Sequence, residues 1–495
     1  MSGPDVVVVG SGNAALCAAL AASQEGARVT VFERAPEEEC GGNSRFTAGS
    51  IRFAYSGLDE LREVLTDLSA GEIAVTDFGS YSEDEFFDDM FRVTDYRCDP
   101  DLVESLVKRS KDTLVWLRKA GIRFVPIYGR QAFKVDGRFK FWGGLTVEAS
   151  GGGPGLVDGL TAACRKRGIT ISYGARVVDL SFDGRDVTGV VVRRDGGRPE
   201  TVPARAVVLA SGGFQANPEW RTRYLGPGWE LAKVRGTRFN TGDGIRMALA
   251  IGAAPYGNWS GCHAVAWDRN APEFGDLAVG DQFQKHSYPF GIVVNANGRR
   301  FIDEGADFRN YTYAKYGAEL LKQPGQFAWQ IFDAKTKNLL RDEYSIRQVT
   351  RETGGSLEEL LDRMEDVDSA ACKAEIASYN AAVRQDIPFD PNVRDGRCTE
   401  GLAVDKSNWA NTIDEPPFEA YAVTCGITFT FGGLRIDTEG RVLDTDLKPI
   451  PGLYAAGELV GGLFFHNYPG GTGLLAGAVF GRICGASAAR SPAAA

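Results

Sequence analysis

The sequence predicts an α/β protein with a Rossmann-like dinucleotide-binding domain, which both ends of the chain build around an inserted α+β capping domain. Three observations predict it. A strand, a glycine turn and a helix open the chain, an apolar strand ending in glycine returns at 452–457, and the composition changes between 253 and 405. We therefore expect residues 1–252 and 406–495 to form the dinucleotide-binding domain and residues 253–405 to form the cap.

The first 33 residues have the pattern of a βαβ unit. Residues 5–10 (DVVVVG) are a β-branched run, typical of a strand buried on both faces of a parallel sheet. The alanine-rich segment 13–25 is predicted to be a helix that ends at Gly26, and 28–33 (RVTVFE) is predicted to be the second strand.

A Gly-x-Gly-x-x-Ala motif lies between this strand and this helix, at Gly10, Gly12 and Ala15. The glycines permit a tight turn and the close approach of a pyrophosphate, and the helix N-terminus supplies free N–H groups. Glu33 ends the second strand 21 residues after Gly12, where a carboxylate accepts both ribose hydroxyls. The motif predicts a dinucleotide site, and the alternative is a glycine turn that merely joins a strand to a helix.

Two further glycine-rich turns and a C-terminal strand that ends in Gly457-Glu458 indicate a ligand longer than one βαβ unit can bind. The first turn is CGGNSRFTAG at 40–49, and the second is PGGTGLLAGAVFGR at 469–482, which opens the last predicted helix. The N-terminus of that helix is suited to the pyrimidine edge of a flavin, where negative charge accumulates on reduction. These features favour FAD over NAD.

Composition excludes several classes of function. The chain has 495 residues, too many for one simple core, and a formal net charge of −10 with no Lys/Arg-rich block. Nucleic acid is therefore not an expected partner, and any positive field for an anionic substrate must come from a few arginines in a cleft. No apolar stretch reaches 18 residues and no basic region precedes the N-terminal apolar run, so neither a transmembrane segment nor a signal peptide is predicted.

The nine cysteines are scattered, odd in number and never spaced C-x-x-C. This pattern predicts reduced thiols in a cytoplasmic protein, and it argues against a c-type haem or an internal iron–sulfur cluster. No metal site is predicted, and any electron acceptor is expected to be a separate molecule.

The middle of the chain gives weaker patterns. Residues 100–120 are predicted to be one helix with Pro100 at its first position. Residues 124–153 are aromatic and basic without a clean period, which predicts an irregular functional loop. Paired strands are expected near 177–182 and 187–194, and charged helices between 356 and 385.

Seven stretches carry a resemblance to a known family: VVGSGNAALCAALAA, GGNSRFTAGSIRFAY, RAVVLASGGF, NTGDG, NGRRFIDEGADFRNYTYAKYG, GLYAAGEL and HNYPGGTGLLAGAVFGR. They resemble the fumarate reductase and succinate dehydrogenase flavoprotein superfamily over nearly the whole chain, and within it the tricarballylate dehydrogenases. The resemblance implies an FAD-binding domain of the glutathione-reductase type with an inserted cap. It also implies non-covalent FAD, because the respiratory members attach FAD through a histidine in a glycine-rich loop, where this chain has Asn43.

The same resemblance implies a set of FAD contacts along the chain. They are Gly10, Gly12, Asn13, Ala14, Ala15, Glu33, Arg34, Gly42, Asn43, Ser44, Val177, Ala210, Ser211, Gly212, Asp243, Gly457, Glu458, Gly473, Leu474 and Leu475.

Two residues of the predicted cap are candidates for the reaction. His263 aligns with a substrate-binding histidine of fumarate reductases, and Arg309 aligns with their proton-donating arginine, although one extra residue separates it from Glu304. A guanidinium binds a carboxylate in a bidentate manner and stays positive, which makes it a good clamp but a reluctant base. Proton transfer would need activation by Asp303, Glu304 or Asp307. The alternatives are a structural histidine and a solvated surface arginine.

Two departures from the fumarate reductase pattern weaken simple fumarate reduction. Thr428 and Phe429 stand where those enzymes have a second histidine, and Tyr468 stands where they have a second substrate arginine. A tyrosine at that place resembles the ketosteroid dehydrogenases, and His466 is expected to assist it, because a phenol with a pKa of about 10 needs help near neutral pH. The alternative for Tyr468 is packing over the flavin.

A dehydrogenase or reductase acting on a CH–CH bond beside a carboxylate, most of all a tricarballylate-like polycarboxylate, is the function that the resemblance implies. The basic aromatic segment 124–153, with Tyr128, Arg130, Lys134 and Arg138, is expected to add positive charge over the substrate, unless it is a solvated surface loop. A quinone, an iron–sulfur protein or another separate acceptor would take the electrons. The alternatives are oxidation of a cyclic ketone and a flavin-binding protein without turnover.

Overall fold

Strand β1 (Val6–Val9) lies in the interior of a six-stranded sheet, as its unbroken valine run predicts. The computed structural model describes residues 3–194 and 196–492. Val6 pairs in parallel with Val29 on one side and with Ala206 on the other. The sheet order is β20 (Arg441–Leu443), β21 (Pro449–Ala455), β13 (Ala206–Leu209), β1, β2 (Val29–Phe32) and β9 (Thr170–Ser172). Strands from both ends of the chain therefore build one sheet, as expected.

Helices α1 (Asn13–Gln24) and α14 (Thr472–Ala489) pack directly against each other. A Cβ atom on Gly485 would lie 2.1 Å from the carbonyl oxygen of Ala18, and one on Gly481 would lie 2.4 Å from that of Ala14. Both distances are far below van der Waals contact, so only glycine at these positions permits the observed approach. The first and the last helix of the chain therefore form one layer.

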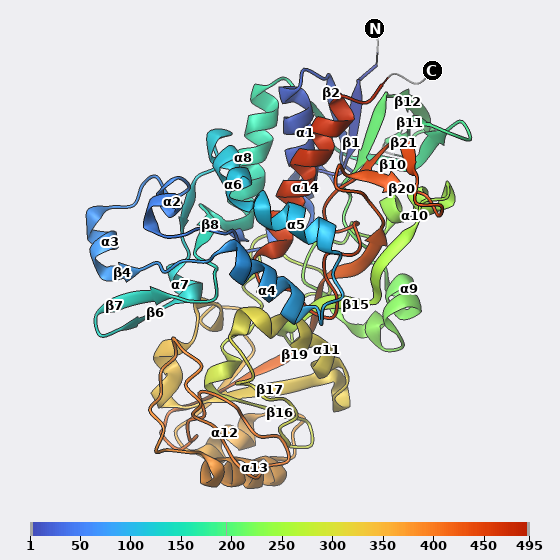
Figure 1. The fold of residues 1–495 in the computed structure, drawn as a ribbon. Helices are drawn as coiled ribbons and strands as arrows, with labels where there is room; N and C mark the ends of the chain where they lie inside the picture. Colours follow the sequence, from blue (N-terminus) through green and yellow to red (C-terminus); the bar gives the residue numbers. More distant parts are fainter. Residues whose placement is uncertain (1–2, 195, 493–495) are drawn as a thin grey trace.

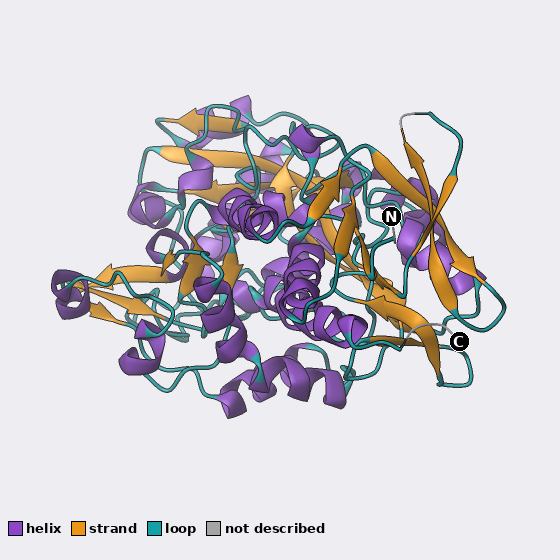
Figure 2. Ribbon diagram, turned by 90° about the horizontal axis from the view of Figure 1, so that it is seen from above, coloured by secondary structure: helices purple, strands orange, loops and turns teal. Residues whose placement is uncertain are grey.

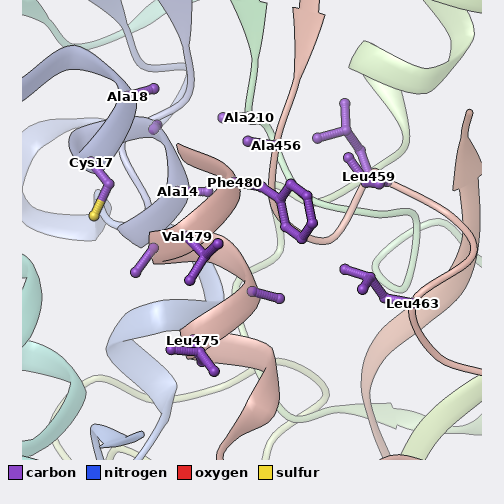
Figure 3. Close-up of a cluster of buried hydrophobic side chains, with 14 of the residues drawn as sticks. Ala14, Cys17, Ala18, Ala210, Ala456, Leu459, Leu463, Leu475, Val479 and Phe480 are labelled. Atoms are coloured by element: carbon purple, nitrogen blue, oxygen red, sulfur yellow. The ribbon is translucent and has the colours of Figure 1, made fainter. Parts of the chain in front are cut away.

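Apolar side chains fill this contact. Figure 3 shows Val479 of α14 in the same cluster as Cys17 and Ala18 of α1. Among the described residues, α14 is the one helix long and apolar enough to cross a membrane by length and composition, although no apolar run of that length was expected. Its 18-residue window is 61% buried inside the protein, which is the situation of a core helix.

The inserted lobe has a mixed sheet of its own, which lies below the first sheet in Figure 1. The path is β14 (Lys233–Val234), β19 (Phe418–Leu434), β17 (Phe327–Phe332) and β16 (Ile292–Asn295), while β15 (Pro255–Asp268) and β18 (Arg351–Gly354) also pair with β19. Helices α11 (Tyr313–Leu321), α12 (Leu357–Arg363) and α13 (Ser369–Ala382) complete the lobe. Because β14 and β19 belong to it, this sheet extends beyond 253–405 at both ends.

Two predictions for the N-terminal half were wrong in detail. The helix expected at 100–120 is two helices, α5 (Pro100–Lys108) and α6 (Ser110–Lys119), and the break lets the buried Ser110 hydroxyl accept a hydrogen bond from the backbone N–H of Ala54 at 3.1 Å. Residues 124–153 are not irregular, because they form several short elements. These elements are β5 (Phe124–Pro126), α7 (Tyr128–Gln131), β6 (Ala132–Val135), β7 (Arg138–Phe141) and β8 (Val147–Ala149).

The remaining elements lie around the first sheet, and some of them project with the β6–β7 hairpin to one side of the molecule (Figure 1). Figure 2 shows the same elements from above. The predicted strand pair is present as β10 (Ala175–Phe182) and β11 (Val187–Arg194), followed by β12 (Glu200–Pro203). The others are β3 (Ser50–Ile51), α2 (Leu58–Arg62), α3 (Ala70–Val75), β4 (Thr76–Asp77), α4 (Glu83–Val93), α8 (Gly152–Lys166), α9 (Pro218–Trp220) and α10 (Asp243–Ala250).

Candidate active site

One elongated cavity runs from the glycine turn after β1 to the inserted lobe. All the predicted FAD contacts line it except Ala15 and Leu475. Those two side chains are fully buried in the main apolar core instead, because Ala15 and Leu475 lie on the packed faces of α1 and α14. Neither side chain is therefore part of the cavity wall, and an FAD contact at these two positions stays a prediction.

The turn between β1 and α1 has the geometry of a pyrophosphate site. Gly10 has φ 108°, and a Cβ atom there would lie 2.5 Å from the carbonyl oxygen of Ala210, so glycine is required. Gly12 has no side chain to cap the N-terminus of α1; the N–H of Asn13 donates to the hydroxyl of Ser44 at 3.0 Å, and the next N–H groups of the first turn are left available to an anion. The buried hydroxyl of Ser211 also has no hydrogen-bond partner among the described residues.

The adenosine end of the cavity contains Glu33. One of its carboxylate oxygens accepts a hydrogen bond from the Ser11 hydroxyl at 2.5 Å, and the other accepts one from the backbone N–H of Ala35 at 2.7 Å. Burial raises the pKa of Glu33 above its usual value. The carboxylate is thus held in place at the end of β2, where the motif predicts ribose hydroxyls.

Asp243 closes the same end of the cavity and is held by two arginines. Arg176 donates a bidentate pair of hydrogen bonds to it at 2.9 Å each, and Arg34 donates one at 3.2 Å. Glu458, from the turn after β21, accepts a hydrogen bond from the backbone N–H of Thr430 at 3.0 Å. Burial raises the pKa of Glu458 to about 7. These carboxylates connect segments that are far apart in the sequence.

The opposite end fits an isoalloxazine ring. The N-terminus of α14 has no side-chain cap at Gly471, where φ is 84°, and its first turn lines the cavity. Asn43, from the glycine-rich segment 40–49, is held between two backbone groups. It donates to the carbonyl oxygen of Thr428 at 2.5 Å and accepts from the N–H of Thr237 at 2.9 Å.

Arg309 lines the cavity from the short helical turn Arg309–Tyr311, which comes just before α11. It is only 9% exposed, donates one hydrogen bond to the carbonyl oxygen of Arg130 at 3.2 Å, and lies over the ring of Tyr313 at 5.6 Å. Its Nε has no partner, and among the described residues no carboxylate forms an ion pair with it. Burial lowers the pKa of the Arg309 guanidinium below its usual value.

None of the three carboxylates proposed to activate Arg309 contacts it. Glu304 pairs with Arg300 at 2.6 Å, and Asp307 pairs with Arg92 at 2.8 Å. Asp303 accepts a hydrogen bond from the hydroxyl of Ser407 at 2.5 Å. That expectation was wrong, because each carboxylate binds a group outside the cavity.

Tyr468 lines the cavity, and its hydroxyl is hydrogen-bonded to that of Tyr313. His263 lies immediately behind them: its ring is edge-on to both tyrosines, at 4.9 Å from Tyr468 and 5.0 Å from Tyr313, and stacked on Phe429 at 5.1 Å. It is fully buried without being part of the cavity wall, and neither ring nitrogen has a partner among the described residues. Burial lowers the pKa of His263 well below its usual value, so the ring is neutral.

His466 does not take the place expected for it. Its side chain is exposed and is not part of the cavity wall, and its ring packs edge-on against Phe465 at 4.7 Å. The residue has a positive φ of 61°, and its N–H donates to the side chain of Asn258 at 3.0 Å. This turn directs Tyr468 inward and His466 outward, so His466 is not in position to assist Tyr468.

The family model described as "FAD binding domain" matches residues 5–475. The chain belongs to the FAD binding domain family. Its relatives include the "Probable fumarate reductase Ifc3" of Shewanella frigidimarina (strain NCIMB 400), 29% identical over 98% of this chain and 74% of that protein. They also include the "3-oxosteroid 1-dehydrogenase" of Mycobacterium tuberculosis (strain ATCC 25618 / H37Rv), 25% identical over 95% of both. The open conformation of a flavocytochrome c3 fumarate reductase superposes with a TM-score of 0.72, at 28% identity over 98% of this chain and 78% of that one.

As a member of the FAD binding domain family, the protein is an FAD-dependent oxidoreductase with the fold of fumarate reductases and ketosteroid dehydrogenases. The geometry fits that cofactor. Two uncapped helix N-termini and the unpartnered hydroxyl of Ser211 face one cavity, and the glycines that line it leave room for a ligand against the backbone.

Sequence reasoning missed part of the catalytic end of this FAD-binding protein. Arg235 and Asp281 line the cavity, and Arg130 pairs with Asp281 at 2.9 Å. His286 is also fully buried here, with its ring 4.9 Å from that of Tyr313. Of these four residues only Arg130 was among those expected to add charge over the substrate. Lys134 and Arg138, which were expected to do the same, are exposed on the β6–β7 hairpin.

Proposed function

We propose that the protein oxidises or reduces a CH–CH bond next to a carboxylate, and that a tricarballylate-like polycarboxylate is its substrate. The observation that carries this proposal is the uncompensated charge of Arg309. A buried guanidinium without a carboxylate partner is costly, and an anionic substrate would supply the missing partner.

Arg309 would bind the carboxylate next to the reacting carbons. Removal of a proton from a carbon beside a carboxylate builds negative charge on that group, and a fixed guanidinium stabilises this charge as it develops. When bound at the N-terminus of α14, FAD supplies the hydride acceptor or donor. The residues of the chain need only bind, orient and exchange a proton.

The tyrosine pair is the proposed route for the proton. Tyr468 and Tyr313 are hydrogen-bonded to each other on the cavity wall, and burial raises the pKa of both phenols. Each therefore remains protonated at neutral pH and can donate from oxygen. His263, neutral and packed against both rings, would hold the pair in place.

We also propose a separate electron acceptor, such as a quinone or an iron–sulfur partner protein, a cytoplasmic location, and non-covalent binding of FAD. The last proposal has a direct test. Denaturation in acid should release all the yellow colour into the supernatant, whereas colour that stays with the precipitated chain would contradict it.

Anaerobic titration of the purified holoprotein tests the reaction. Tricarballylate or succinate should bleach the flavin absorbance near 450 nm, and fumarate or aconitate should restore it after chemical reduction. Failure of every di- and tricarboxylate to change the spectrum in either direction would end the proposal.

Arg309→Lys is the matched variant. It keeps the charge but loses the bidentate geometry, so the rate of flavin reduction should fall by about 100-fold or more. Arg223→Gln, at an exposed arginine paired with Glu219, is the control and should leave the rate unchanged.

A second candidate function is oxidation of an uncharged cyclic ketone. The paired tyrosines, together with Phe429 and Phe464 in the cavity wall, favour it. It predicts that ketosteroids bleach the flavin and that Arg309→Lys has little effect. The two candidates therefore give opposite results with the same variant.

A further inference from the structure

Three charged side chains, those of Arg130, Asp281 and Arg235, form a cluster at the end of the cavity that Arg309 lines. Asp281 accepts two hydrogen bonds from Arg130, at 2.9 and 3.1 Å, and its carboxylate is 3.6 Å from the guanidinium of Arg235. All three line the same cavity as Arg309. Although burial alone would raise it, the neighbouring arginines hold the pKa of Asp281 below its usual value, so the carboxylate is charged.

The two arginines that contact Asp281 are not equivalent. Arg130 forms a bidentate pair of hydrogen bonds with Asp281. Arg235 has only the longer contact with Asp281 and one hydrogen bond to the hydroxyl of Thr428 at 3.2 Å, and its buried Nε has no partner among the described residues. Asp281 therefore compensates the positive charge of Arg130, and the positive charge of Arg235 has no carboxylate of its own.

Arg309 and Arg235 thus bring two positive charges to one cavity, and neither has a carboxylate of its own: Arg309 forms no ion pair among the described residues, and Arg235 shares Asp281 with Arg130.

We propose that Arg235 is a second carboxylate-binding residue, positioned by the Arg130–Asp281 pair, and that it restricts the substrate to molecules with at least two carboxylates. This inference rests on the proposed function, since it describes how the same cavity selects among carboxylates. Arg235 would determine which acids bind, and Arg309 would hold the carboxylate beside the reacting bond. Asp281 is a positioning residue that need not touch the substrate.

The test compares succinate with butanoate, which has the same four carbons and one carboxylate fewer. Dissociation constants are measured with the holoprotein from the perturbation of the flavin spectrum under air, and by the ligand-induced rise in melting temperature as a second readout. Wild type should bind succinate and tricarballylate much more tightly than butanoate. Arg235→Gln should weaken succinate binding by about 30-fold or more and change butanoate binding by less than about threefold.

Asp281→Asn tests whether Asp281 positions Arg235 or acts only through its negative charge. If Asp281 positions Arg235, succinate binding weakens even though the cavity gains a net positive charge. Tighter binding of both acids, or no change, would overturn the positioning role. Arg223→Gln serves as the control, and flavin content near 450 nm confirms that each variant is folded and loaded.

The outcomes distinguish this inference from the proposed function. If no carboxylate perturbs the wild-type flavin, the proposed function fails. If wild type prefers succinate and Arg235→Gln keeps the same preference, only the role of Arg235 is overturned. An equal loss of affinity for succinate and butanoate in Arg235→Gln would also overturn it. Such a result would mean that Arg235 attracts any anion and does not bind a second carboxylate.

Discussion

Tyr313 of α11 and Tyr468 of the C-terminal segment share a hydrogen bond between their phenolic oxygens, with ring centroids 6.0 Å apart. The two residues come from different lobes of the molecule. Their contact therefore connects the inserted lobe to the FAD-binding part directly at the cavity wall, and any opening between the lobes has to break or stretch it.

Replacing Tyr468 with phenylalanine should slow the reaction without preventing binding. The variant keeps the ring packed against Phe429 but removes the hydroxyl, so we expect kcat to fall by about 100-fold while KM changes little. Stopped-flow reduction of the flavin measures the step directly. Tyr96→Phe, at a side chain that is 78% exposed, is the control, and an unchanged rate in Tyr468→Phe would exclude its hydroxyl from proton transfer.

Glu33→Gln should weaken FAD binding. The carboxylate is already oriented by Ser11 and Ala35, and a neutral amide would accept weaker hydrogen bonds from ribose hydroxyls, so a loss of about tenfold in affinity is expected. Quenching of flavin fluorescence on titration of the apoprotein gives the dissociation constant. Glu37→Gln changes an exposed carboxylate nearby and should leave the affinity unaltered.

The buried His286 predicts a dependence of stability on pH. Burial, together with the nearby charge of Arg309, lowers the pKa of His286 well below its usual value. Below about pH 6.5 the unfolded chain binds a proton here and the folded chain does not, so this contribution is complete above that pH and is lost as the pH falls, by about 1.4 kcal/mol per pH unit.

The comparison that isolates this contribution is wild type against His286→Gln. Groups such as Glu148, whose pKa burial raises to about 7, act in the opposite direction but are common to both proteins and cancel in the difference. The melting temperature of wild type should decline relative to the variant between pH 6.5 and pH 5. Parallel curves over that interval would mean that His286 titrates normally in the folded protein.

Gly485→Ala should destabilise the layer formed by α1 and α14. The added methyl group would lie 2.1 Å from the carbonyl oxygen of Ala18, so the helices must separate, at a cost of about 1–3 kcal/mol. Thermal denaturation should show a lower midpoint, and FAD should bind less tightly, because the first turns of both helices line the cavity. Gly71→Ala, in the exposed helix α3, is the control: an added methyl group would meet only the Ser69 hydroxyl, at 3.9 Å, so the melting midpoint should not fall.

The cofactor end could be predicted from sequence because its chemistry is local. Gly10, Gly12 and Glu33 belong to one continuous βαβ unit, and the structure places them on the cavity wall as expected. Which side of a helix faces the cavity was harder to predict from sequence. Ala15 and Leu475 belong to the predicted segments, but their side chains face the core, because neighbouring positions of a helix point in different directions.

The substrate end depends on contacts between distant segments. Asp281 meets Arg130 and Arg235 across 151 and 46 residues of sequence, and no spacing rule connects such positions. His466 illustrates the opposite error, since its proximity to Tyr468 in sequence suggested cooperation, whereas a left-handed backbone conformation turns it to the surface. The short strands within 124–153 were missed because three or four residues are too few to show a period.

The pairing of β21 beside β13 and of α14 against α1 has a consequence for biosynthesis. Both late elements leave the ribosome after the whole inserted lobe, so a growing chain carries its glycine turn and the apolar face of α1 uncovered for most of translation. The six-stranded sheet and the layer formed by α1 and α14 can therefore be completed only at the end of synthesis, when β21 and α14 have emerged.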